Sequence, residues 1–179
     1  MEIRMSKLTT PVSLTDTVIV HQQGVLSWWL EHLLAARLAL NVPTSTVDPL
    51  DSLINSFLGR VLMLGLKPPM EVVRRVERGS IAVSEFLLDP MTPRVRRYRC
   101  DQHGSIALLV HGFHALATTD QYSYRRVAGI GYDCFTFAAN TFKPTEYDAL
   151  VYNELATNFE RYGAILNETI SQASQSKQE

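Results

Sequence analysis

A stripe of apolar residues in the last third of the chain constrains the fold most strongly. After Pro144 these residues recur at spacings of three and four, as Tyr147, Leu150, Val151, Leu155, Phe159, Tyr162, Ile165, Leu166 and Ile170. Residues with this spacing lie on one face of an α-helix. The stripe therefore predicts a long amphipathic helix, followed by a flexible polar tail at residues 173–179.

A second segment, residues 25–40, reads VLSWWLEHLLAARLAL and is apolar on almost every side of the helix that it predicts. A helix of this kind packs in a core or against a partner, because a helix at a water-exposed surface carries a polar face. Trp28 and Trp29 are its largest side chains. The β-branched run before it leaves two alternatives for residues 1–22, an N-terminal arm or a short strand.

Proline and glycine divide the middle of the chain into further helices. Asp48 followed by Pro49 predicts a helix start, because the carboxylate can accept hydrogen bonds from free backbone amides and proline suits the first turn. Gly65 is the expected left-handed cap of this helix. The next helix, MEVVRRVER, is expected to end at Gly79, and Ser105 is expected to cap a later one.

These patterns predict a mainly α, single-domain helical bundle of about six helices over residues 23–172. Residues 81–100 are compatible with strand or helix, so there is room for one or two short strands. A chain of 179 residues with 46% hydrophobic and 20% charged residues can bury one core, and this composition excludes general disorder.

The sequence predicts no membrane span. Glu31, His32 and Arg37 interrupt the most apolar segment, so no apolar run reaches the roughly 18 residues that a membrane helix needs. The start of the chain also lacks the continuous apolar segment of a secretory signal. We therefore expect a cytoplasmic location, or one within an intracellular particle, and we expect Cys100 and Cys134 to be buried thiols.

Charge is unevenly distributed, although the net charge is only −1. Residues 60–126 hold 11 basic and 6 acidic residues, and residues 127–179 hold 3 basic and 7 acidic residues. Two basic clusters also contain tyrosine: Arg94, Arg96, Arg97, Tyr98 and Arg99, and then Tyr124, Arg125 and Arg126. Arginine binds phosphate and tyrosine stacks on bases, so single-stranded nucleic acid is one candidate ligand. The alternative is pairing with carboxylates, within the chain or head to tail between copies.

The segment SIALLVHGFHALATTD, residues 105–120, contains the best candidates for chemistry. His111 and His114 are three residues apart and share a helix face, and His103 lies just before them. These histidines are weak metal-ligand candidates, because the second ligand pair of a structural zinc site is missing. The favoured interpretation is a packed helix. We predict no catalytic residue and no cofactor.

Three functions follow as expectations. The first is a non-catalytic structural subunit of a larger protein assembly, which contacts other subunits or copies of itself. Its expected interface residues are Trp28, Trp29, Tyr147, Leu155, Phe159 and Tyr162. The second is a protein that coats single-stranded nucleic acid through the two arginine clusters. The third, of lower rank, is a small metal-dependent enzyme that uses the three histidines.

Overall fold

The computed structural model describes residues 14–45, 47–79, 91–117 and 121–175, and it describes side chains from residue 23 onward except at 114–117 and 121–123. The described residues form seven α-helices and no strand, which confirms the prediction of a mainly α bundle. The helices are α1 (Leu14–Ala39), α2 (Pro49–Leu66), α3 (Met70–Arg78), α5 (Pro93–Ala117), α6 (Gln121–Ala139), α7 (Tyr147–Thr157) and α8 (Phe159–Gln175).

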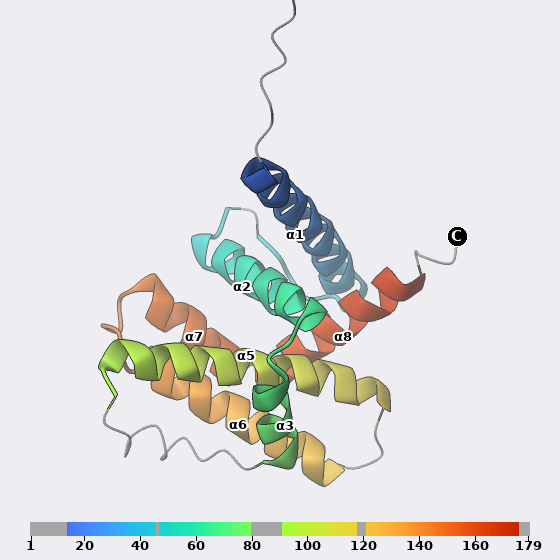
Figure 1. The fold of residues 1–179 in the computed structure, drawn as a ribbon. Helices are drawn as coiled ribbons and strands as arrows, with labels where there is room; N and C mark the ends of the chain where they lie inside the picture. The colour runs from blue at the N-terminus through green and yellow to red at the C-terminus, as the bar shows by residue number, and fades with distance from the viewer. Residues whose placement is uncertain (1–13, 46, 80–90, 118–120, 176–179) are drawn as a thin grey trace, which may run out of the picture.

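The helices are arranged in two layers. The antiparallel pair α5 and α6 forms the lower layer, and α1, α2 and α8 lie above it (Figure 1). α3 packs on α5 and α6, and α7 packs beside α6. Gly104 allows α5 to approach α6 closely, because a Cβ atom at this position would lie 2.6 Å from the ring of Phe135. That ring is fully buried at the centre of the core.

Two of the predicted helix ends are confirmed and one is wrong. The Asp48 side chain accepts a hydrogen bond from the Leu50 N–H at 3.0 Å, at the start of α2. Gly79 ends α3 with a φ of 61°, in the left-handed region. Gly65, in contrast, does not end its helix, because α2 continues to Leu66. The absence of a side chain at Gly65 serves packing there, since a Cβ atom would press on a leucine of α5.

Several predicted boundaries are corrected. α1 begins at Leu14, so residues 14–22 are helical where an arm or a short strand was expected. In the segment 81–100, for which strand and helix were both open, residues 93–100 are helical because α5 begins at Pro93. Residues 81–90 lie outside the described ranges. Ser105 lies inside α5 and caps no helix. α8 extends to Gln175, into the predicted tail.

The C-terminal stripe forms two helices in place of the single predicted helix. The break is at Asn158, the residue between α7 and α8, where φ is −112°. The Asn158 side chain donates a hydrogen bond to Glu154 Oε1 at 2.8 Å, which holds the chain at the break. The stripe still faces the core on both sides of the break, because Leu155 and Phe159 are buried.

The two cysteines confirm the prediction of buried thiols. Cys100 on α5 and Cys134 on α6 are both free and fully buried. A hydrogen bond between their side chains lowers the pKa of Cys100 and raises the pKa of Cys134, and burial raises the latter further. None of the described helices combines the length and the apolar character that a membrane span requires.

Candidate functional site

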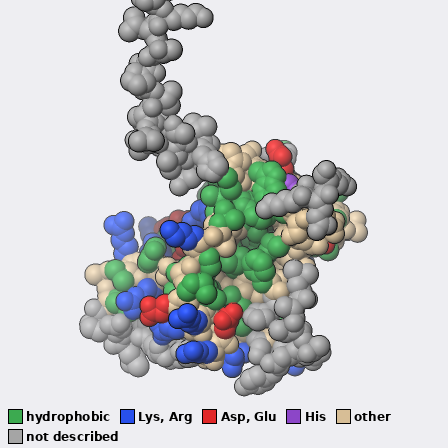
Figure 2. All heavy atoms as spheres, turned by 45° about the vertical axis from the view of Figure 1, so that its right-hand side comes forward, with side chains coloured by type: hydrophobic (Ala, Val, Ile, Leu, Met, Phe, Trp, Pro, Cys, Tyr) green, Lys and Arg blue, Asp and Glu red, His purple; other side chains and the backbone are tan. Residues whose placement is uncertain are grey.

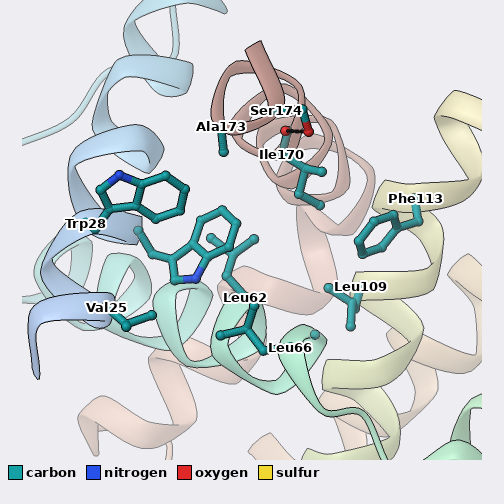
Figure 3. A pocket seen from close by; sticks show the side chains of 11 residues that line it. Val25, Trp28, Leu62, Leu66, Leu109, Phe113, Ile170, Ala173 and Ser174 are labelled. Atoms are coloured by element: carbon teal, nitrogen blue, oxygen red, sulfur yellow. Dashed lines mark hydrogen bonds between the residues drawn. The ribbon is translucent and has the colours of Figure 1, made fainter. Parts of the chain in front are cut away.

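An apolar groove lies where α1, α2, α5 and α8 meet. Its cavity volume is about 460 Å³, within the range of typical ligand-binding clefts. Figure 3 shows Trp28 of α1 and Phe113 of α5 on opposite sides, with α2 below and α8 above. The lining residues are Val25, Trp28, Trp29, Leu62, Gly65, Leu66, Leu109, Phe113, Ile170, Ala173 and Ser174.

The two tryptophans form the α1 wall of the groove. Their rings meet edge to face, with centroids 4.7 Å apart and an interplanar angle of 68°. Trp29 is buried and Trp28 is half-buried. The buried Nε1–H of Trp29 has no hydrogen-bond acceptor in the described part of the chain. A buried indole N–H normally has an acceptor, and none of the described residues supplies one here.

Among the described side chains, the remaining walls carry no ionisable group. Leu62 and Leu109 are buried at the base, whereas Leu66 is 61% exposed and Phe113 is 44% exposed at the rim. The one lining hydroxyl belongs to Ser174, and it donates to the backbone carbonyl of its own helix at 2.8 Å. Figure 2 shows hydrophobic side chains gathered around a hollow on this face, with basic side chains below and to the left. The groove can therefore receive apolar groups, and its described lining residues include no general acid or general base.

The structure divides the predicted interface residues into three groups. Trp28 and Trp29 lie in the groove wall, where a partner could contact them. Leu155, Phe159 and Tyr162 are at most 4% exposed and pack in the protein's own core, which corrects their assignment to an interface surface. The physical reason is that α7 and α8 turn the stripe toward the other helices of the same chain. Tyr147, also expected at the interface, is 54% exposed at the start of α7, outside the groove.

The two arginine clusters do not lie together. Because α5 and α6 are antiparallel, residues 94–99 lie at one end of this pair and Arg125 at the other. Arg97 is engaged within the fold: its Nε donates to Thr141 Oγ1 at 2.8 Å, and its guanidinium lies 3.8 Å from the ring centroid of Phe142.

The other members of these clusters differ in exposure. Arg126 donates to the backbone carbonyl of Glu77 at 2.6 Å and so ties α6 to α3. Arg96 is half-buried, whereas Arg94, Tyr98, Arg99 and Arg125 are exposed. The exposed members could meet a ligand only as two separate patches.

The histidines serve packing in the described structure. His111 is 1% exposed, and its ring lies against Tyr124, with centroids 3.8 Å apart. Burial, together with the negative charge of Glu160, raises the pKa of Tyr124. His103 is also buried, and its Nδ1 lies 2.7 Å from the carbonyl oxygen of Arg99. The side chain of His114 is outside the described part, and within that part no three His, Cys, Asp or Glu residues are grouped as metal ligands.

Sequence reasoning found the tryptophan wall but missed the other three. Leu62, Leu66, Leu109 and Phe113 appear in sequence as ordinary core residues of separate helices. A pair of leucines one turn apart, as in α2, is compatible with either a core or a groove. Comparison of the chain with protein-family models, with curated proteins and with solved structures finds no match.

Proposed function

We propose that this protein is a non-catalytic subunit of a larger protein assembly, in the cytoplasm or in an intracellular particle, and that its groove receives apolar side chains of a protein partner. The observation that carries the proposal is the groove itself. It has four apolar walls and an open side, and none of the lining residues that the structure describes is ionisable. Apolar pockets that hold aromatic and aliphatic anchors are where protein interfaces concentrate their binding free energy.

The two tryptophans support a protein partner in particular. Tryptophan combines a large apolar surface with one hydrogen-bond donor, and it is enriched at interface hot spots. Trp28, which is half-buried in the groove wall, is the tryptophan whose ring a partner can contact directly. Leu66 and Phe113 are exposed at the rim, and a bound partner would bury their apolar surface away from water.

The proposal is tested by placing a photoreactive phenylalanine derivative at Phe113 and irradiating cells or extracts of the source. The matched control carries the same group at Leu150, which is 38% exposed on α7 and lies outside the groove. We expect a specific protein crosslink from position 113 and not from position 150. A Ser174→Trp substitution, which fills the groove, should abolish this crosslink. Equal crosslinking at both positions, or none at position 113, would contradict the proposal.

A second candidate function is coating of single-stranded nucleic acid. The observation that favours it is Tyr98, which is 64% exposed, with Arg94 one helical turn before it. Such a pair can stack on a base and bind the adjacent phosphate. Binding of a single-stranded oligonucleotide should then weaken steeply with salt, and Arg94→Gln should reduce the salt dependence by about one unit in log–log slope. Salt-independent binding, or no binding, excludes this candidate.

A further inference from the structure

α1 carries a second exposed apolar feature, on a different side from the groove. Leu34 and Leu38 lie one turn apart and are 40% and 78% exposed. We call this pair the leucine ridge. Arg37, which lies between the two in sequence, is turned into the protein and is only 3% exposed, because it forms a salt bridge with Asp51. The ridge is therefore free of charge at its centre, although the sequence reads LAARL.

The ridge and the tryptophan wall of the groove lie on nearly opposite sides of α1. An α-helix turns about 100° per residue, so the mean direction of Leu34 and Leu38 lies roughly 150° around the α1 axis from the mean direction of the groove residues Val25, Trp28 and Trp29. One molecule cannot insert its own ridge into its own groove with this geometry. A contact between the ridge of one molecule and the groove of another is head to tail.

We infer that the leucine ridge of one copy docks into the groove of a second copy. This inference rests on the proposed function and names a second copy of this chain as the partner. Both surfaces are apolar and uncharged at their centres. Two neighbouring leucines on a helix are the kind of anchor that an apolar groove accepts in helix-in-groove recognition.

Charges at the two edges are complementary. Glu31 is exposed one turn before Leu34, at the edge of the ridge, and Lys67 is exposed directly after Leu66, at the rim of the groove. Neither side chain forms a salt bridge with another residue in the described ranges. Opposite charges at the rim of an apolar contact orient the two partners as they meet.

A head-to-tail contact leaves one ridge and one groove unused in every dimer. Such a heterologous contact adds further copies and yields rings or open chains. This outcome differs from that of a two-fold symmetric contact, which stops at a dimer. The difference provides the test, because variants of the ridge and of the groove can complement each other only in the head-to-tail case.

The experiment measures self-association of the full chain by sedimentation velocity over a concentration series. Leu38→Glu changes the ridge, Leu66→Glu changes the groove rim, and Leu150→Glu is the matched control on α7. We expect each of the first two variants to lower the association constant at least about tenfold, as for interface hot spots. We expect Leu150→Glu to associate like the wild type. Leu38 and Leu66 are largely exposed, so these variants should fold, and far-UV circular dichroism verifies this. If Leu66→Glu fails to fold, Ser174→Trp replaces it as the variant that blocks the groove.

Mixing the two variants gives the decisive result. Leu38→Glu retains an intact groove and Leu66→Glu retains an intact ridge, so an equimolar mixture should form 1:1 dimers and nothing larger. Absence of these dimers overturns the inference. A wild-type chain that remains monomeric also overturns the inference. In that case a crosslink from position 113 to a different protein would leave the proposed function intact. The absence of any crosslink would overturn both the inference and the proposed function.

Discussion

Arg37 ties the turn between α1 and α2 to the first turns of α2, and its replacement by methionine should destabilise the fold. Its guanidinium forms a salt bridge with Asp51 at 2.7 Å. It also donates hydrogen bonds to the Asn55 side chain and to the backbone carbonyl of Pro43. The side chains of Arg37 and Asp51 are 4% and 13% exposed, so this ion pair is largely shielded from water.

The expected loss follows from what remains after the substitution. Arg37→Met preserves most of the side-chain volume but leaves the carboxylate of Asp51 without its cation. Removing one member of a buried ion pair costs about 3–5 kcal/mol. Asp51 keeps a hydrogen bond from the Ser45 N–H and some contact with water, which places the loss near the lower end, at about 3 kcal/mol. For a domain of this size such a loss lowers the Tm by about 6–12 °C.

The assay is urea unfolding at pH 7, followed by circular dichroism at 222 nm. The matched control is Arg74→Met, on the exposed side of α3, which should change the free energy of unfolding by less than about 0.5 kcal/mol. Arg37→Met combined with Asp51→Leu should be less destabilising than the sum of the two single variants, because no buried charge remains. A stability of Arg37→Met within about 0.5 kcal/mol of the wild type, or strictly additive losses, would refute this reasoning.

Three further predictions concern local packing and titration. Burial, together with the hydrogen bond that Tyr162 donates to Glu154, raises the pKa of Tyr162, whereas the unfolded side chain titrates near pH 10. The resulting stabilisation is fully present below about pH 10, and above it the free energy of unfolding falls by up to about 1.4 kcal/mol per pH unit. Tyr162→Phe should make this fall less steep in urea unfolding between pH 8 and pH 11. Gly104→Ala should cost about 1–3 kcal/mol, because the new methyl group would clash with the ring of Phe135, and calorimetry would detect the lowered Tm. Asp48→Ala should cost about 1 kcal/mol in the same measurement, while Asp48→Asn, which can still accept the capping hydrogen bond, should cost much less.

The helix ends that could be predicted from sequence are those decided by local chemistry. Asp48 with Pro49, and Gly79 with its left-handed φ, act through their own backbone and nearest neighbours. Gly65 has the same local signal as Gly79, but contact with α5 decides its structure, and α2 continues through it. The break at Asn158 was missed for a related reason, since the apolar spacing of three and four continues across it.

The groove could be predicted only in part, because four helices that are distant in sequence create it. The apolar sequence of α1 predicted that Trp28 and Trp29 contact other apolar residues. This prediction needs only the sequence of one helix. Which residues would stand opposite them depends on how α2, α5 and α8 pack. The arginine clusters also show that sequence alone does not give the contacts made after folding. Arg97 appears available in sequence, but the fold brings the Thr141 side chain and the ring of Phe142 to it.

α1 provides the strongest physical argument that the chain has a protein partner. A helix at the edge of a globular protein needs one apolar stripe, toward the core, and Leu33 and Ala36 supply it here. α1 also has apolar side chains at the groove, beside this stripe, and on the opposite side of the helix at the leucine ridge. Trp29 also belongs to the protein's own core, whereas Leu34 and Leu38 are exposed, and water contact with exposed apolar surface costs free energy in proportion to its area. A partner that covers the groove and the ridge, as proposed above, would remove this cost.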